Sequence, residues 1–432
     1  MERVKLKELI AWKNSPERKP LIIKGARQVG KTWLMQEFGR TQYVQTVYLN
    51  FEKEKRLKGL FNDDFDIKRI ITALQAESGL TIDPGNTLLI FDEIQSVPEA
   101  ITALKYFQED GRDYHIVAAG SLLGMALHSD ASFPVGKVAF MDLHPLTYEE
   151  FLDAMGEKAL TEILESTDWK LITAYKSKYI DRLRQYYFVG GMPEAVFQFS
   201  KNNSFREVRD IQKQILESYE HDFSKHASAS IVPRIRMLWN SIPSQLAKEN
   251  RKFIYGLVKE GSRAKDYEIA LSWLVDCGQV HQVYRVTKPG LPLKAYEDRG
   301  AFKLFLVDTG LLSAMCDIDS KTLLEGNTIF TEFKGALTEQ YVFQQLKSAS
   351  EFPVYYWSAE RSTAEVDFVL QHKNRLIPME VKAEVNLQSK SLKVFREKFN
   401  ITFSIRSSLS DFRKQDQLTN LPLYAISLIG KV

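Results

Sequence analysis

Hydrophobic residues in the first third of the chain occur in short, nearly continuous runs, at residues 21–23, 47–50, 87–91 and 115–119. Runs of this length without polar alternation are typical of parallel strands that are buried on both faces. The run at 87–91 ends in two acidic residues, Asp92 and Glu93. The pattern predicts an α/β domain with a parallel sheet, in which the tip of this strand carries acidic side chains into an active site.

The middle of the chain has a helical pattern. From about residue 150 to residue 223, apolar residues recur at spacings of three and four. Gly190 and Gly191, followed by Pro193, predict a tight corner between two helices. Residues 226–300 indicate two helices and then two extended segments, which is the order of a winged helix. Winged helices bind the DNA major groove or other proteins, and both partners stay open here.

Near the C-terminal end, polar and apolar positions alternate as they do in a half-buried hairpin. Residues 365–370 and 376–382 form the two alternating stretches, joined by a polar turn. In the first stretch Val366, Phe368 and Leu370 are expected on one face, so Asp367 points from the other. In the second stretch Glu380 and Lys382 share one face, so the hairpin is predicted to bring Asp367, Glu380 and Lys382 together.

Length and composition limit the class of protein. With 432 residues, of which 44% are hydrophobic and 26% charged, the chain is predicted to form several globular domains. The expected divisions are an ATPase domain at 1–155, a helical lid-like region at 156–225, a winged-helix-like domain at 226–318 and a nuclease-like domain at 319–432. Two cysteines are too few for a disulfide framework, and neither a signal peptide nor a membrane-spanning segment is recognisable. These features predict a cytoplasmic protein without a membrane partner.

The most specific motif is the octet G-x-x-x-x-G-K-T directly after the first apolar run, formed by Gly25, Ala26, Arg27, Gln28, Val29, Gly30, Lys31 and Thr32. Backbone N–H groups of such a loop, together with the following helix N-terminus, bind phosphate. Lys31 is expected to reach the β- and γ-phosphates, while Thr32 and Asp92 hold Mg²⁺. Glu93 is expected to orient the attacking water. Ser121, after the run at 115–119, is a candidate sensor of the γ-phosphate. The octet therefore predicts ATP and Mg²⁺ as cofactors.

These residues resemble the AAA-type ATPases, and within them a prokaryotic group in which the ATPase domain is followed by a Pro-Leu-Ser/Thr-Phe/Tyr-Glu-Glu-Phe segment. Here that segment is residues 145–151, Pro-Leu-Thr-Tyr-Glu-Glu-Phe. Members of the group commonly carry a Gly-Arg pair shortly before it, whereas this chain has Gly136 and Lys137. A lysine lacks the planar fork of an arginine, so Lys137 is not expected to act as an arginine finger. The alternatives are that Arg112 or another arginine takes this role, or that the ATPase is slow and switch-like. AAA proteins often form rings, so a homo-oligomer is one of the states that the resemblance allows.

A second resemblance concerns the predicted hairpin and a helix expected at residues 333–346. This helix carries Glu339 on its apolar stripe, where a carboxylate is costly unless a partner such as a metal ion neutralises it. The set Glu339, Asp367, Glu380 and Lys382 resembles nucleases of the restriction-endonuclease and Holliday-junction-resolvase type. The resemblance implies that the carboxylates hold Mg²⁺ against a phosphate and that the lysine helps the attack of water.

Net charge is +3, and basic residues outnumber acidic ones in the C-terminal half, where a DNA-binding surface is therefore expected. The sequence predicts an ATPase whose nucleotide cycle controls a DNA-directed, Mg²⁺-dependent nuclease module. One alternative is an ATP-dependent switch whose C-terminal domains bind a protein partner and cut nothing. Another is a DNA-binding regulator with weak ATPase activity.

Overall fold

The computed structural model describes residues 2–54, 56–61, 64–120, 134–246, 252–325, 331–349, 352–359, 364–383 and 390–432. The chain forms two compact units. The N-terminal unit consists of residues 2–144 together with residues 276–278, and the C-terminal unit of residues 145–275 and 279–432. The four divisions predicted from the sequence stay a prediction. None of the helices in the described part of the chain combines the length and the hydrophobicity of a bilayer-spanning segment.

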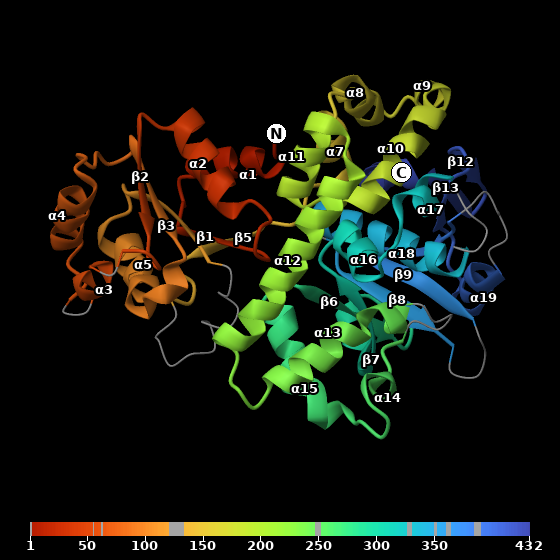
Figure 1. Cartoon of the computed structure of the whole chain (residues 1–432). Helices are drawn as coiled ribbons and strands as arrows, with labels where there is room; N and C mark the ends of the chain where they lie inside the picture. The colour runs from red at the N-terminus through yellow and green to blue at the C-terminus, as the bar shows by residue number, and fades with distance from the viewer. Residues whose placement is uncertain are drawn as a thin grey trace. The chain divides into compact units, whose positions relative to one another are not determined.

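The N-terminal unit is a five-stranded parallel sheet with helices on both faces (Figure 1). Its strands lie in the order β2-β3-β4-β1-β5. Its elements are α1 (Lys5–Lys13), β1 (Leu21–Lys24), α2 (Lys31–Gln42), β2 (Gln45–Asn50), α3 (Leu57–Leu60), α4 (Ile67–Ser78), β3 (Thr87–Asp92), η1 (Ile94–Ser96), α5 (Pro98–Asp110), β4 (His115–Ala119) and β5 (Ala139–Asp142). The predicted α/β architecture with a parallel sheet is confirmed here.

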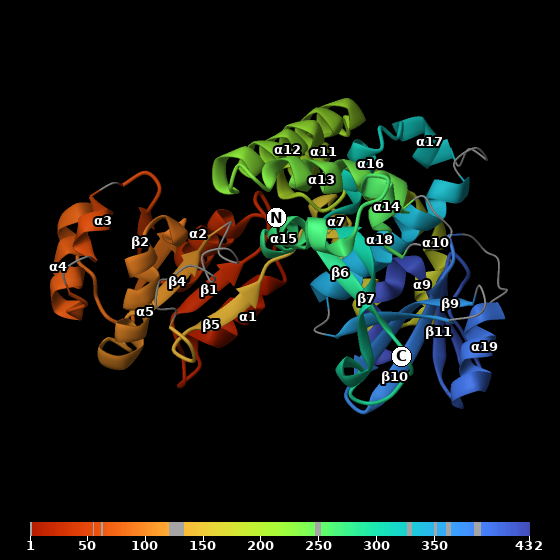
Figure 2. The same cartoon turned by 90° about the horizontal axis from the view of Figure 1, so that it is seen from below.

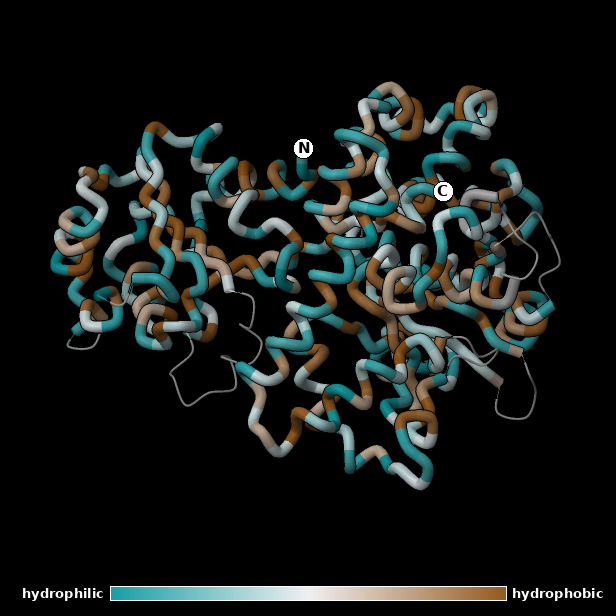
Figure 3. The backbone as a smooth tube through the Cα atoms, in the orientation of Figure 1, coloured by the Kyte–Doolittle hydropathy of each residue, from teal (hydrophilic) through white to brown (hydrophobic). Residues whose placement is uncertain are grey.

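Strand β3 shows why the apolar runs predicted this sheet. All six of its residues are buried, since successive side chains of a strand point to opposite faces and both faces are covered. Leu89 and Phe91 pack into a core with Leu104 and Phe107 of α5. In Figure 3 hydrophobic, brown stretches of the backbone lie in the interior of this unit. The polar side chains of β3 therefore lie only at its ends, and Asp92 is its last residue.

The first part of the C-terminal unit is helical. Its helices are α7 (Tyr148–Ala154), α8 (Lys158–Ser166), α9 (Trp169–Ala174), α10 (Lys176–Val189), α11 (Pro193–Asn202), α12 (Phe205–His226), α13 (Val232–Leu246), α14 (Tyr255–Val258) and α15 (Ala264–Asp276). Helix α7 begins with a capping box, because Thr147 accepts from the backbone of Glu150 and the Glu150 carboxylate accepts from the backbone of Thr147. The corner predicted at Gly190 and Gly191 joins α10 to α11, and Pro193 is the first residue of α11.

The rest of this unit is built around an eight-stranded mixed sheet of order β12-β13-β11-β10-β9-β8-β6-β7. Its elements are β6 (Val280–Val286), η2 (Leu293–Tyr296), β7 (Glu297–Leu306), α16 (Thr309–Met315), α17 (Ser320–Glu325), α18 (Thr331–Ala349), β8 (Val354–Ser358), β9 (Glu365–His372), β10 (Arg375–Val381), α19 (Lys390–Phe399), β11 (Ser404–Ser408), β12 (Arg413–Gln415), β13 (Leu418–Pro422) and η4 (Leu423–Lys431). The first segment predicted as the wing is strand β6, but the second, residues 293–296, is the 3-10 helix η2, so that part of the prediction is wrong. The antiparallel partner of β6 is β7, and β6 also pairs with β8.

Helices α18 and α19 pack on this sheet. Phe343 of α18 stacks on Phe305 of β7, which in turn contacts Phe368 of β9. Leu392 and Phe395 of α19 pack into a separate core against β8 and β9. Figure 2 shows α19 beside strands β9 and β11. The predicted hairpin β9–β10 is thus a central part of a larger sheet.

Candidate functional site

The loop between β1 and α2 has the backbone that the octet requires. Gly25 and Gly30 have φ of +151° and +92°, values that side chains rarely adopt. A Cβ atom on Gly25 would lie 2.2 Å from the carbonyl oxygen of Leu143. Gly30 is the N-cap of α2, so the loop runs directly into a helix N-terminus. Both glycines are therefore needed for this strand, loop and helix arrangement, which favours binding of an anion.

Lys31 is buried inside the loop. Its Nζ donates hydrogen bonds of 2.8 Å to the carbonyl oxygens of Gly25 and Ala26. Burial lowers the pKa of Lys31 to about 8, although the nearby Glu93 and Asp92 act in the opposite direction. The ammonium therefore stays largely charged at neutral pH while it is poorly solvated. A phosphate group beside the loop would stabilise that charge.

The carboxylate of Asp92 accepts hydrogen bonds from three groups. Thr32 Oγ1 and Tyr48 Oη donate to its Oδ2 over 2.7 and 2.8 Å, and the backbone N–H of Glu93 donates to its Oδ1 over 3.1 Å. A hydroxyl and a carboxylate oxygen held side by side fit Mg²⁺, which prefers hard oxygen ligands. Thr32 and Asp92 are thus well placed to hold the ion. The sequence prediction did not include Tyr48.

Glu93 lies just beyond β3 in a left-handed backbone conformation, with φ of +51°. Its Oε2 accepts a 2.6 Å hydrogen bond from Nε2 of Gln95. Non-glycine residues in this conformation are uncommon and often occur at functional sites. The predicted sensor Ser121 lies outside the described residues. Lys137 forms a 2.9 Å ion pair with Glu109 at the surface, so its charge already has a partner.

A second polar cluster lies in the C-terminal unit, around the ammonium group of Lys303 on β7. The Lys303 side chain is fully buried. Its Nζ lies 2.8 Å from Glu339 Oε1, 2.5 Å from Glu365 Oε1 and 3.9 Å from Asp367 Oδ1. Oxygen atoms of these three carboxylates lie within 4.8 Å of one another, close enough to share one cation. Three carboxylates around one ammonium leave a formal charge of −2. We call Lys303, Glu339, Glu365 and Asp367 the carboxylate cluster.

The structure unites only part of the predicted nuclease set. Glu339 and Asp367 belong to the carboxylate cluster, together with Glu365, which the sequence prediction did not include. Glu380 pairs with Lys382 instead, over 2.6 Å. Asp367 is linked to their strand through its Oδ2, which accepts a 2.8 Å hydrogen bond from the backbone N–H of Val381. The geometry thus adds one carboxylate to the metal-ligand candidates and places a lysine between them.

A β-bulge next to Asp367 changes which side chains of β9 lie on the same face of the sheet. Between β8 and β9, Tyr355 pairs with Val369 but Trp357 pairs with Val366, so the register shifts by one residue. Val366 and Val369 consequently pack together against α19, whereas Phe368 contacts Phe305 near α18. The expectation that Val366 and Phe368 share a face is therefore wrong. Bulges of this kind often redirect side chains beside functional sites.

Comparison with known proteins divides the chain into three matched regions. Residues 17–152 match the family described as an AAA domain. Residues 180–322 and 334–426 match two families described as domains of unknown function, DUF8612 and DUF4143. Residues 17–152 form an AAA-type P-loop ATPase domain. The predicted ATPase domain is thereby confirmed, and the regions 180–322 and 334–426 contribute strands to one and the same eight-stranded sheet.

Two mycobacterial proteins described as uncharacterized are similar over most of the chain. They are Rv2008c of Mycobacterium tuberculosis and Mb2031c of Mycobacterium bovis, each 25% identical over 369 residues, which is 84% of this chain and 70% of theirs. Among solved structures, the Walker-type ATPase PABY2304 of Pyrococcus abyssi covers 73% of this chain and 95% of its own, with 13% identity and a TM-score of 0.46. The RuvB Holliday junction branch migration motor of Thermotoga maritima covers 66% of this chain and 90% of its own, with 14% identity and a TM-score of 0.31.

A buried hydrogen-bond network lies in the C-terminal unit, where the chain enters it from the ATPase domain. The backbone N–H of Tyr148 donates to Gln345 Oε1 over 2.8 Å, and the Tyr186 hydroxyl donates to the carbonyl of Leu146. Gln344 and Gln345 of α18 each donate to the Tyr186 hydroxyl, over 3.0 and 3.2 Å. The chain leaving the ATPase domain is therefore bonded to the helix that carries Glu339.

Asp308 closes this network. It is fully buried, and its Oδ2 accepts from the backbone N–H of Gly191 over 2.6 Å and from Gln344 over 3.0 Å. Burial raises the pKa of Asp308, while the hydrogen bond from Gly191 acts against that rise. Gly190 and Asp308 touch so closely that a Cβ on Gly190 would lie 2.1 Å from Asp308 Oδ1. The segments 145–151, 186–196 and 302–312 thus meet in one hydrogen-bond network.

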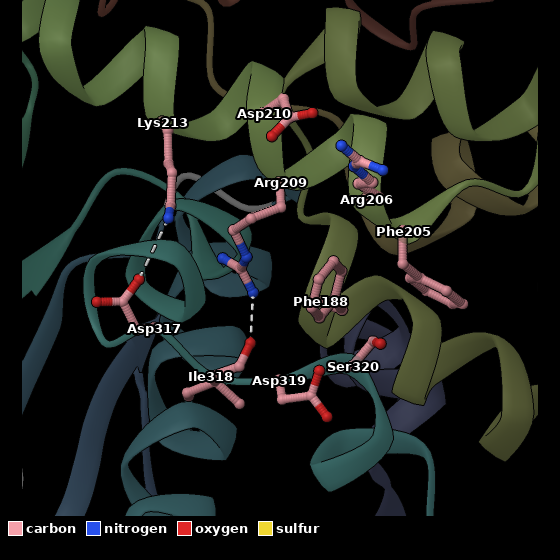
Figure 4. A pocket seen from close by; sticks show the side chains of 10 residues that line it. All are labelled: Phe188, Phe205, Arg206, Arg209, Asp210, Lys213, Asp317, Ile318, Asp319 and Ser320. Carbon is pink, nitrogen blue, oxygen red and sulfur yellow. Dashed lines mark hydrogen bonds and ion pairs between the residues drawn. The ribbon is translucent and has the colours of Figure 1, made fainter.

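A separate cavity of about 350 Å³ lies between α12 and the turn after α16 (Figure 4). From α12, Arg209 reaches the carbonyl of Ile318 over 2.7 Å and stacks on Phe188, and Lys213 pairs with Asp317 over 3.6 Å. The charged side chains around the cavity are Arg206, Arg209, Lys213, Asp210, Asp317 and Asp319. Their formal charges balance, so the lining selects neither an anion nor a cation.

Proposed function

We propose that the chain hydrolyses ATP at the loop 25–32 and that the nucleotide cycle controls the C-terminal unit. The observation that carries the first part is the pairing of Thr32 with Asp92 over 2.7 Å, next to the buried ammonium of Lys31. The loop N–H groups and Lys31 bind the phosphates, and Thr32 and Asp92 position the metal. Mg²⁺, when bound, neutralises charge on the phosphate oxygens. Glu93 orients a water molecule for attack on the γ-phosphate.

Phosphate release from ATP by the purified full chain tests this proposal. Glu93→Gln should retain nucleotide binding and lower the rate at least about a hundredfold, since it removes the general base. Lys31→Ala should lower both binding and rate. Glu99→Gln changes an exposed glutamate of α5 and should leave the rate unchanged. Hydrolysis that survives Lys31→Ala at the wild-type rate would contradict the assignment.

Control of the C-terminal unit is supported by the hydrogen-bond network at the point where the chain enters that unit. Leu146 and Tyr148, immediately after the N-terminal unit, are bonded to Tyr186 and to Gln345 of α18. Helix α18 also carries Glu339 of the carboxylate cluster. Movement of the segment that leaves the ATPase domain is therefore expected to reach that cluster through hydrogen bonds and one helix.

The second candidate function is Mg²⁺-dependent cleavage of DNA by the C-terminal unit. The specific observation in its favour is the proximity of Glu339, Glu365 and Asp367, whose oxygens could share a cation. Lys303 would have to move aside or act beside the ion, because its ammonium lies among these oxygens. In the alternative function, the carboxylate cluster is structural and the unit is a switch that binds a protein partner.

Incubation of the full chain with Mg²⁺ or Mn²⁺ and single-stranded, duplex and branched DNA separates these functions. Cleavage that disappears in Asp367→Ala and Glu365→Ala, but persists in the exposed Asp416→Ala, supports the nuclease. Absence of cleavage on every substrate would leave the switch. DNA binding itself should weaken steeply with salt, because basic side chains would displace counterions from the phosphates.

A further inference from the structure

Arg3 is a buried arginine beside the phosphate loop that the proposed ATP chemistry does not yet use. Its side chain is only 7% exposed, although it lies before the first helix. Nη1 donates a 3.2 Å hydrogen bond to the carbonyl of Val29, and Nη2 donates a 2.6 Å hydrogen bond to the carbonyl of His144. All three residues belong to the N-terminal unit. One guanidinium thus joins the phosphate loop to the last residue of the unit before Pro145.

The bond to Val29 has a consequence for the neighbouring amide. The Val29 carbonyl and the Gly30 N–H belong to the same trans peptide group and point in opposite directions. A guanidinium that holds the carbonyl on one side therefore fixes the direction of the Gly30 N–H on the other side. Gly30 is the N-cap of α2, the position where loop amides bind phosphate in this motif. A bond to a cationic donor also polarises the peptide, so the N–H becomes a stronger donor.

The exit segment, residues 143–144, contacts the loop at both ends. The backbone N–H of Leu143 donates to the carbonyl of Lys24 over 2.8 Å, and the Leu143 carbonyl lies against Gly25. At the other end, Arg3 bridges His144 and Val29. A rearrangement of the loop would therefore displace the exit segment.

We propose that Arg3 is a positioning residue of the ATP site, which orients the Gly30 N–H toward the phosphates and ties the loop to the exit segment. This inference rests on the proposed ATP function, because it assigns a residue to the same site. Only an arginine fits the role fully, since its planar fork donates to two carbonyls at once, whereas a lysine offers a single ammonium.

Binding of fluorescent ATP and ADP analogues to the full chain tests the first half. Arg3→Gln should weaken both nucleotides about tenfold, since both carry phosphates that the oriented amide would contact. Arg3→Lys should show an intermediate loss. Arg40→Gln is the matched control, because Arg40 is exposed and pairs with Glu37 on α2 of the same unit. Its affinity should equal that of the wild type.

Thermal unfolding of the same proteins separates positioning from a purely structural role. If Arg3→Gln and Arg3→Lys lower the melting temperature but bind nucleotides within twofold of the wild type, the proposal is overturned. Should Arg3→Gln fail to fold, Arg3→Lys alone decides by the same criterion. If the wild type binds nucleotides but does not hydrolyse them, the proposed hydrolysis is refuted. The binding measurements on the Arg3 variants still decide whether Arg3 is a positioning residue. Wild-type protein that binds no nucleotide would overturn both.

Hydrogen exchange tests the second half. In the wild type, addition of ATP should change amide protection in peptides that cover residues 143–148. In Arg3→Gln, at nucleotide concentrations that saturate the variant, this change should be lost. If the nucleotide-dependent change persists in the saturated variant, the link between loop and exit segment is overturned.

Discussion

Replacement of Lys303 by methionine should make the stability of the C-terminal unit depend on divalent cations. The substitution keeps much of the side-chain volume but removes the ammonium from among Glu339, Glu365 and Asp367. Removing one partner of a buried ion pair costs about 3–5 kcal/mol. The side chains of Glu365 and Asp367 are 17% and 21% exposed, so water relieves part of this cost. We therefore expect a loss of about 3 kcal/mol, near the lower end of that range.

Differential scanning calorimetry of the full chain measures this effect. For a unit of this size, a loss of about 3 kcal/mol corresponds to a melting temperature lower by about 6–12 °C. The vacated centre is then free for a cation. With a dissociation constant of about 1 mM, 10 mM Mg²⁺ would restore about 1.4 kcal/mol, or about 3–6 °C. The wild type should gain much less, because its own ammonium competes for the same oxygens.

The matched control is Lys347→Met, which removes an exposed lysine of α18. It should change the melting temperature little and add no dependence on Mg²⁺. If Lys303→Met is destabilised and responds to none of Mg²⁺, Mn²⁺ and Ca²⁺, the carboxylate cluster does not bind a cation in the absence of its lysine. That result would remove the main support for the nuclease function.

Three further predictions concern single side chains. Tyr48→Phe removes one of the hydroxyl donors to Asp92, so the Mg²⁺ concentration for half-maximal ATP hydrolysis should rise about tenfold, with little change in rate at saturating Mg²⁺. Lys31→Met should stabilise the nucleotide-free protein against thermal unfolding by up to about 3 kcal/mol at pH 7, because the folded state lowers the pKa of this lysine to about 8 and so disfavours its charged form. The wild-type lysine loses its charge above pH 8 in the folded state, but only near pH 10.5 in the unfolded state. The gain in stability of Lys31→Met over the wild type should therefore be full below pH 8 and shrink between pH 8 and pH 10.5. Gly190→Ala should lower the melting temperature far more than Gly156→Ala. Both glycines have positive φ, but only at Gly190 would the new Cβ collide with a buried carboxylate, at 2.1 Å.

The nucleotide site could be predicted because its residues are close in sequence to strong local signals. The octet from Gly25 to Thr32 follows an apolar run, and Asp92 and Glu93 end another. In a parallel sheet with buried strands, such tips converge at one edge. Tyr48 escaped the prediction because a tyrosine on a strand indicates packing unless its neighbour across the sheet is known. Tyr48 pairs with Ile90 of β3, and its hydroxyl reaches Asp92 two residues further along that strand, a contact that depends on the pairing of β2 with β3.

The carboxylate cluster was only half predictable, for a related reason. Glu339 and Asp367 had local signals, namely an acid on an apolar helix face and an alternating strand. Lys303 lies within an apolar segment on β7. The pattern of hydrophobic and polar residues does not indicate what a lysine at this position binds. Its partners come from α18 and β9, which are distant in sequence. Glu365 is the first residue of β9. The bulge that follows it cannot be predicted from an alternating pattern of polar and apolar residues.

In the coupling of the two sites that we propose, helix α18 is the connecting element. Gln344 and Gln345 bind Tyr186 and the backbone of Tyr148, whereas Glu339 on the same helix binds Lys303. Five residues of helix separate Glu339 from Gln344, a rise of about 7.5 Å. A helix of this length is stiff, and the network at its Gln344 end is buried and densely hydrogen-bonded. A shift of the segment at Tyr148 would therefore move α18 as a body and change the separation of Glu339 from Lys303. The carboxylate cluster would then respond to nucleotide through a change in one ion pair, without any ligand reaching it.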